Sequence, residues 1–275
     1  MTTKVLLIFL MCLSVNSVAA AEYADTCATE ITSEQQFAKV MSVNYTGVGI
    51  VTVWGVLQWD YFSRSPHSQS EGWFGNDTDD GGADKLGHLY TSYVTSHGFS
   101  SLFSYWCFNK HDAAFYGALS SFSVWGYMEL GDSFSDYGFS KEDLWMNALG
   151  SVLGYYLYEN ENLASKIDMR WEYGLHPTGT DFTTDYENSK YLIALKLSGF
   201  EKTSGGFSKY LELQLGYYAR GFYDPAVTNE RNLYFGIGIN LSELFRRGGY
   251  KKTAAAFNYL QVPATYISIV KDQNK

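Results

Sequence analysis

The stretch GGADKLGHLYTSYVTSHGFSSLFSYWCFN, residues 81–109, decides the fold, because a polar beginning leads directly into a long run without Asp, Glu, Lys or Arg. The run from Leu86 to Asn109 follows a helical pattern and reaches the length of about 17–25 residues that a membrane span requires. Ser, Thr, Gly and His dilute its hydropathy. Two interpretations therefore stay open: a bundle embedded in a membrane, or a soluble bundle with an unusually aromatic surface.

Three further segments follow the same helical pattern, and together with residues 86–109 they predict a four-helix bundle. They are Ser42–Trp59, Ala113–Met128 and Leu144–Tyr158. Small residues such as Gly150 and Gly154 recur at the spacing of one helical turn, which allows helices to pack closely. We expect this bundle to contact a membrane.

From about Arg170 the sequence alternates with a period of two, as strands do. Strands are expected at residues 191–200, 209–222, 231–241 and 264–270. The second places two sets of side chains on opposite sides: Leu211, Leu213, Leu215 and Tyr217 on one, and Glu212, Gln214, Gly216 and Tyr218 on the other. We predict a small antiparallel sheet with one buried face. The fold class is then α+β, with a helical domain at 22–168 and a β region at 169–275.

The first 21 residues have the features of a secretory signal peptide: a short basic start, an apolar core from Val5 to Leu13, and small residues before Glu22. The protein is therefore expected to be exported, to the periplasm or the outer membrane. No Leu-x-x-Cys motif for lipid attachment is present. In the exported chain Cys27 and Cys107 form either a disulfide or two buried thiols, since sequence cannot show that they are close.

Composition and missing motifs exclude several classes of function. The formal charge of −9 argues against nucleic acid as a partner. No Gly-rich phosphate loop follows a strand and no Gly-x-Ser-x-Gly elbow occurs, which argues against a nucleotide site and a serine hydrolase. The 23 tyrosines within an aromatic content of 17% favour a membrane interface or a binding cleft. A membrane or an envelope lipid is the expected partner, and no protein partner is identified.

Polar residues stand out against the apolar helices in three places, of which the first is Asp84, Lys85 and His88. Asp84 and His88 are four residues apart, so on a helix they lie on one face. Asp84 has a structural alternative as the N-cap of the helix. His88 has an alternative as a hydrogen-bonded core histidine.

The second place is the end of the helix predicted at residues 113–128. Glu129 lies in its last turn, where a carboxylate opposes the helix dipole at a cost of roughly 0.3–1 kcal/mol. A cationic partner is needed to offset this cost, and Lys85 is the expected partner. Asp132 either extends the cluster or lies in the following turn.

The third place is the start of the last helix. Ser140 and Asp143 match a helix-capping box, which accounts for Asp143 in structural terms. Asn147 lies one turn further along an apolar helix, where an unpartnered amide would be costly to bury. Asp143 and Asn147 thus form a polar face like that of Asp84 and His88.

DKLGHLYTSY, WGYMELGDSFSDYGFS and EDLWMNALGSVLG resemble the D-K-x-x-H, E and D-x-x-x-N-x-x-G pattern of VanZ-like membrane proteins. With NDTDDGGADKLGH before it and RNLYFGIGINLSEL near the end, the region 54–244 resembles the YfiM-like family of exported bacterial envelope proteins. Asp132 departs from the VanZ-like pattern, which has Gln there, and some YfiM-like members are lipoproteins. The resemblance implies an envelope location, a helical core and no established reaction. The matching residues are Asp84, Lys85, His88, Glu129, Asp132, Asp143, Asn147 and Gly150.

Two function hypotheses follow from this cluster. The favoured one is a non-catalytic envelope component whose polar residues form a buried hydrogen-bonded network between close-packed helices. The alternative is an envelope enzyme acting on a lipid-linked or cell-wall metabolite, by acid–base chemistry or with a divalent metal held by carboxylate and imidazole. The alternative has Asp84, His88, Glu129 and Asp143 as catalytic candidates and Lys85, Asp132 and Asn147 as binding candidates. The sequence identifies no cofactor.

Overall fold

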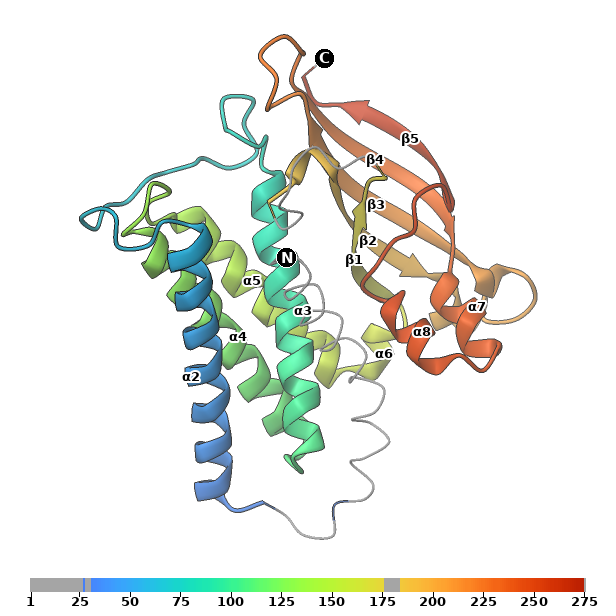
Figure 1. Cartoon of the computed structure of the whole chain (residues 1–275). Coiled ribbons are helices and arrows are strands. Elements are labelled where there is room, and N and C mark those ends of the chain that lie inside the picture. Colours follow the sequence, from blue (N-terminus) through green and yellow to red (C-terminus); the bar gives the residue numbers. More distant parts are fainter. Residues whose placement is uncertain (1–26, 28–30, 176–183, 275) are drawn as a thin grey trace.

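A computed structural model describes residues 27, 31–175 and 184–274 of the chain, so the expected signal peptide lies outside the described residues. Helices come first and a sheet follows, which confirms the α+β class (Figure 1). The described residues contain seven helices rather than four, because three short helices accompany the long ones. The long helices are α2 (Ser33–Gln58), α3 (Ala83–Tyr105), α4 (Lys110–Asp132) and α5 (Lys141–Glu159), and the short ones are α6 (Glu161–Ala164), α7 (Leu241–Arg247) and α8 (Lys251–Ala256).

Helix α3 lies at the centre of the bundle and packs closely on α4 and α5 through small side chains. Ser92, Ser96 and Ser100 recur every four residues and are fully buried. Across from them, a Cβ added to Gly150 of α5 would lie 2.1 Å from the carbonyl oxygen of Leu89. The close approach of α3 and α5 therefore requires glycine at position 150.

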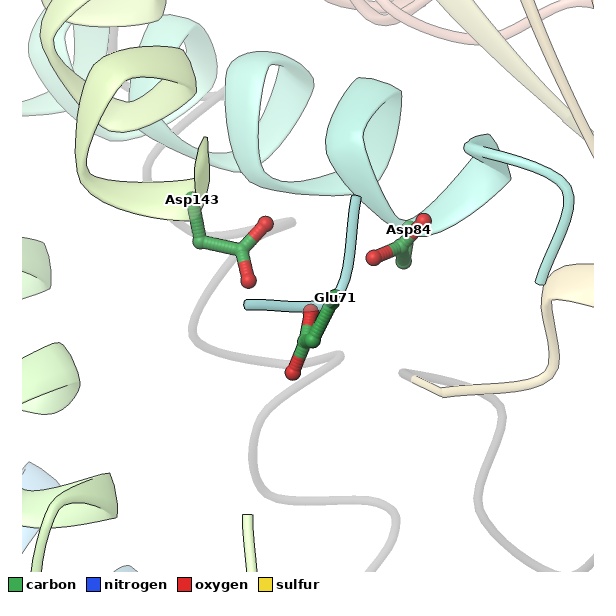
Figure 2. A group of neighbouring side chains, drawn as sticks. All are labelled: Glu71, Asp84 and Asp143. Atoms are coloured by element: carbon green, nitrogen blue, oxygen red, sulfur yellow. The ribbon is translucent and has the colours of Figure 1, made fainter. Parts of the chain in front are cut away.

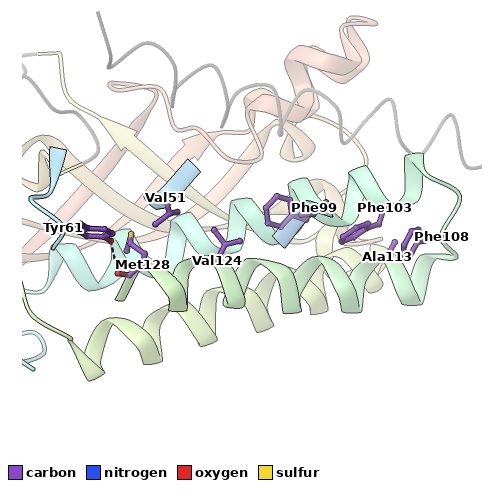
Figure 3. Close-up of a cluster of buried hydrophobic side chains, with 9 residues drawn as sticks. Val51, Tyr61, Phe99, Phe103, Phe108, Ala113, Val124 and Met128 are labelled. Atoms are coloured by element: carbon purple, nitrogen blue, oxygen red, sulfur yellow. Dashed lines mark hydrogen bonds between the residues drawn. The ribbon is translucent and has the colours of Figure 1, made fainter. Parts of the chain in front are cut away.

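Apolar side chains fill the space between α2, α3 and α4 (Figure 3). Aromatic rings dominate the end of this core that lies near the C-terminus of α3, where the ring centroids of Phe103 and Phe108 are 4.9 Å apart. Tyr61, from the loop after α2, closes the other end and donates a hydrogen bond of 3.0 Å to the carbonyl of Met128. The loop that follows α2 is thereby held against the end of α4.

Helix α2 is the one helix of the described residues that is long and apolar enough to cross a membrane, with a mean hydropathy of 1.5 in its best window. Only 22% of that window is buried against the rest of the protein. The segment predicted at residues 86–109 does not meet the same criterion, and its α3 residues are mostly buried by α4 and α5. Length alone therefore did not distinguish a central bundle helix from a span.

The sheet has five antiparallel strands in the order β1-β2-β3-β4-β5, one more than predicted. The additional strand is β1, whose sequence IDMRWEY alternates charged with apolar residues. Its charged side chains, Asp168, Arg170 and Glu172, are all buried, which a search for apolar strands does not anticipate. The strands are β1 (Ile167–Tyr173), β2 (Ser189–Lys196), β3 (Leu211–Arg220), β4 (Glu230–Ile239) and β5 (Tyr266–Asp272).

The buried side of the sheet is largely polar. Arg170 lies between two carboxylates, with nitrogen–oxygen distances of 3.0 Å to Asp168 and 2.7 Å to Glu212. Lys196 approaches Asp168 to 2.7 Å, and the Gln214 amide donates to Glu212 at 2.8 Å. Charged groups can be buried here because they are paired and hydrogen-bonded with one another.

The bundle and the sheet meet where α3 packs on β1 and β2. Tyr90 and Tyr93 of α3 contact Met169, Tyr191 and Tyr259 in a mainly aromatic cluster. The hydroxyl of Tyr90 donates a 2.8 Å hydrogen bond to the carbonyl of Tyr259. The N-terminal half of α3 is thus held on both sides, by helices and by the sheet.

A disulfide joins Cys27 to Cys107, with 5.7 Å between the Cα atoms, which decides between the two expectations for these cysteines. It closes a loop of 80 residues that contains α2 and α3. Loop-closure entropy predicts that reduction lowers the free energy of unfolding by about 4 kcal/mol. Urea unfolding with and without reductant measures this loss. An unchanged midpoint, or a Cys27→Ser/Cys107→Ser variant as stable as the oxidised protein, would contradict it.

Candidate functional site

The site begins at the N-terminus of α3, where two glycines turn the chain into the helix. Gly81 and Gly82 have φ angles of +61° and +83°, which residues with side chains rarely adopt. Gly82 is the N-cap, so the prediction that Asp84 caps the helix is wrong. Asp84 lies instead in the first turn, where its charge is favourable to the helix dipole and free to pair with Lys85.

The ammonium group of Lys85 is the centre of the site and is surrounded by three carboxylates. Its Nζ lies 2.6 Å from Asp84 Oδ2 and 2.8 Å from Asp143 Oδ1, and it also donates to Glu71 Oε2. The side chain is 1% exposed. Burial alone would lower the pKa of Lys85, but the charges of Asp84, Asp143 and Glu71 outweigh burial and raise it. Lys85 therefore carries a permanent positive charge.

Glu71 belongs to this site although sequence reasoning did not find it. It comes from the loop between α2 and α3, in a segment (SQSEGWFG) without helical spacing, so no pattern marked it. Figure 2 shows its carboxylate facing those of Asp84 and Asp143. Burial and the charge of Asp143 raise the pKa of Glu71 to about 8.

Asp143 balances Glu71 electrostatically. Burial would raise its pKa, but the charges of His88 and Lys85 lower it to about 2. Of this carboxylate pair, Glu71 holds the proton at neutral pH and Asp143 is ionised. The hydroxyl of Ser140 accepts from the backbone N–H of Asp143 at 3.3 Å, which confirms Ser140 as the N-cap of α5.

His88 connects three helices. Its Nδ1 lies 3.3 Å from Glu129 Oε1 on α4, and its Nε2 lies 3.8 Å from Asp143 Oδ1 on α5. Burial would lower its pKa, but Asp143 and Glu129 raise it to about 10. At neutral pH His88 is therefore an imidazolium with a carboxylate near each nitrogen.

The prediction that Glu129 pairs with Lys85 is wrong, because Glu129 contacts His88 and Asn147 instead. Lys85 pairs with Glu71, Asp84 and Asp143. The amide of Asn147 donates to Glu129 Oε1 at 2.9 Å. The hydroxyl of Ser92 donates in turn to Asn147 Oδ1, also at 2.9 Å. Asn147 is fully buried and has the polar partners that its place in an apolar helix required.

Asp132 lies at the edge of this arrangement, at the end of α4. Burial and the nearby charge of Glu129 raise its pKa to about 7, while a hydrogen bond with Tyr61 lowers it. Asp80, in the loop before α3, likewise has a pKa raised to about 7, by burial and by the charge of Asp84. These two carboxyl groups add titratable groups at the border of the site.

Three of the carboxylates have the spacing of a metal site. One oxygen each from Glu71, Asp84 and Asp143 lie within 4.8 Å of one another. The ammonium group of Lys85 is bound to all three residues, so it supplies the positive charge that a metal would bring. As arranged, the site is chemically an internal ion-pair network that also carries one exchangeable proton on Glu71.

Residues 70–159 match the model of a family described as predicted periplasmic lipoprotein (DUF2279). The matched region contains every site residue from Glu71 to Asn147. No curated protein and no solved structure matches the chain. The protein is thus an exported one, of the periplasm or associated with the outer membrane. The sulfur of Cys27 is bonded to Cys107, so Cys27 is not free for lipid attachment.

Proposed function

We propose that this protein is a non-catalytic, membrane-associated component of the bacterial cell envelope, in which the network around Lys85 and His88 fixes the bundle. The observation that carries the proposal is the position of the ammonium group of Lys85, whose side chain is 1% exposed and which contacts carboxyl groups from three segments. Glu71 lies in the loop between α2 and α3, Asp84 at the start of α3, and Asp143 at the start of α5. One cation therefore connects the three.

The candidate catalytic groups already have partners in the network. An acid–base site needs a group that is free to meet a substrate, and a metal site needs an open position. Here Glu129 is held by His88 and Asn147, and Asp143 by Lys85. Buried polar networks of this kind specify how helices pack.

Exposed apolar side chains on the helices support the membrane association. Val53, Val56 and Leu57 project from α2, which has the length and composition of a span. Trp145 and Leu149 are exposed on α5. Apolar surface of this extent is typical of proteins that contact a membrane or a partner.

The test of this function is a deletion strain complemented with variants of the full chain. Membrane fractionation reports association, and growth on detergent and EDTA reports envelope integrity. Variants that destabilise the network should lose complementation only in proportion to their loss of folded protein. Loss of complementation by a variant with unchanged stability would contradict the non-catalytic assignment.

An envelope enzyme is the second candidate, favoured by the part of the network that reaches the surface. The side chains of Glu71 and His88 are 24% and 16% exposed, unlike the sealed Lys85. A carboxyl group with a pKa of about 8 holds a proton that it can donate near neutral pH. In this alternative Glu71 is the general acid for a lipid-linked or cell-wall metabolite, held in place by Lys85.

The substitution Glu71→Gln separates the two candidates. Glutamine keeps the shape of the side chain and matches the neutral form that Glu71 adopts below pH 8, so the free energy of unfolding at pH 7 should change by about 1 kcal/mol or less. The non-catalytic assignment predicts full complementation by this variant. Stability by urea unfolding and growth of the complemented strain are measured together, with Glu161→Gln on the exposed Lys110 ion pair as control. A stable Glu71→Gln protein that fails to complement would establish the enzyme instead.

A further inference from the structure

We infer that the outward face of the β-sheet lies on a lipid bilayer, with aliphatic side chains among the acyl chains and cationic side chains at both strand ends near anionic headgroups. The inference rests on the proposed membrane association and adds the surface that makes the contact. This surface is separate from the network around Lys85.

The outward face is a continuous apolar surface. Leu215 of β3, Phe235 of β4 and Ile269 of β5 are register partners, and so form a row across three strands. Ile267 and Ile269 are 85% and 80% exposed. The other large apolar residues exposed on this face, from β2 to β4, are Ile193, Leu215, Leu233, Phe235, Ile237 and Ile239.

The opposite face is closed by polar groups, so the sheet reverses the usual arrangement in water. Glu212 and Gln214 of β3 are buried, whereas their neighbour Leu215 is half exposed. A soluble antiparallel sheet buries its apolar face and exposes its polar one. Strands that meet lipid alternate in the opposite sense, apolar outward and polar inward. β3 and β4, with ten residues each, also have the length of about 9–11 residues typical of such strands.

Cationic residues lie at both ends of this face in a chain whose formal charge is −9. At one end α7 follows β4 directly, and the stretch RRGGYKK, residues 246–252, holds four cations. Arg246 and Arg247 pair with the single carboxylate of Glu243, which leaves an excess of positive charge. At the other end Lys271 is the register partner of Leu233. Basic groups beside an apolar surface bind anionic headgroups.

The same charges argue against a second copy of the chain as the occupant. In a face-to-face pair, either relative orientation of the strands would bring cationic ends together, because cations flank both ends. Like charges that meet across an interface are unfavourable. An anionic lipid surface satisfies both ends at once.

The face lies along the membrane rather than across it. β5 is the last strand in the order, so one of its edges has no strand partner among the described residues. Unpaired backbone groups do not enter hydrocarbon. If the apolar side chains insert about 5–10 Å into the bilayer, the unpaired edge of β5 stays at the level of the lipid headgroups.

A fluorophore on a single cysteine tests this contact in the full chain. Cys27 and Cys107 are bonded and Cys12 lies in the expected signal peptide, so in the exported Ile269→Cys protein the new thiol alone accepts an environment-sensitive label. Glu161→Cys, 86% exposed at the start of α6, is the matched control. With phosphatidylethanolamine–phosphatidylglycerol vesicles, the label at 269 should shift to the blue and be quenched by acyl-chain spin labels, and the label at 161 should not.

Two results would overturn the inference in distinguishable ways. Vesicle binding without quenching at 269 removes this surface and leaves membrane association standing. No vesicle binding at all removes the proposed association as well. Adding Ile267→Glu to the labelled protein should at least halve the quenching with an unchanged circular dichroism spectrum. No quenching at 269, together with a dimer in solution that Ile267→Glu dissociates, would assign the face to a second copy.

Discussion

Replacing Lys85 by methionine should lower the free energy of unfolding by about 3–5 kcal/mol at pH 7, the usual cost of leaving a buried charge without its partner. Methionine has a similar length and shape, so the apolar contacts of the lysine stem remain. What disappears is the charge that Asp84 and Asp143 meet at 2.6 and 2.8 Å. Both carboxylates then face one another without a cation between them. Urea unfolding at pH 7 measures the loss.

Lys110→Met is the matched control for this substitution. Lys110 also forms a short ion pair, 2.6 Å from Glu161, but the two side chains are 45% and 86% exposed. Exposed pairs contribute roughly 0–1 kcal/mol, so this variant should stay within about 0.5 kcal/mol of the wild type. Equal losses in both variants would show that burial does not set the strength of the Lys85 network, and would remove the basis of its proposed role.

Helical spacing was enough to predict how the polar residues within one helix are grouped. Asp84 and His88, and likewise Asp143 and Asn147, lie one turn apart and on one face, so their grouping follows from the chain itself. The poor placement of Glu129 correctly indicated a partner. The identity of that partner depended on how α3 and α4 are rotated about their axes, which spacing within one helix cannot specify.

Glu71 and strand β1 were not predicted, because their segments have no periodic pattern or an unexpected one. Glu71 reaches Lys85 from a loop, and only tertiary structure brings it there. In β1, charged residues occupy the buried positions, because Asp168 and Arg170 neutralise one another inside the sheet. Alternation predicted the two faces of β3 correctly. Which face is buried depends on the surroundings of the sheet, and here the polar side is the inner one.

The stability contributed by His88 should depend strongly on pH. Its pKa in the folded protein, about 10, lies above the value of about 6.5 expected in the unfolded chain. A histidine with a raised pKa stabilises the fold fully when the pH is below its pKa in the unfolded chain. This stabilisation is lost as the pH rises through its pKa in the folded protein. His88→Gln should therefore cost about 3–5 kcal/mol at pH 6 and about 1 kcal/mol or less above pH 10. Urea unfolding of both proteins from pH 6 to 10.5 measures the difference.

The difference in the free energy of unfolding between variant and wild type at each pH separates the contribution of His88 from that of the neighbouring titratable groups. Glu71, Asp80 and Asp132 also have raised pKa values, about 8, 7 and 7, so the fold loses stability as they ionise with rising pH. That decline occurs in both proteins and largely cancels in the difference. His111→Gln is the control, since His111 lies 3.6 Å from Glu159 but is 65% exposed, and its effect should be small at every pH. A cost of His88→Gln that stays constant from pH 6 to 10.5 would mean that His88 is neutral in the fold, and would replace the ion pairs with Glu129 and Asp143 by ordinary hydrogen bonding.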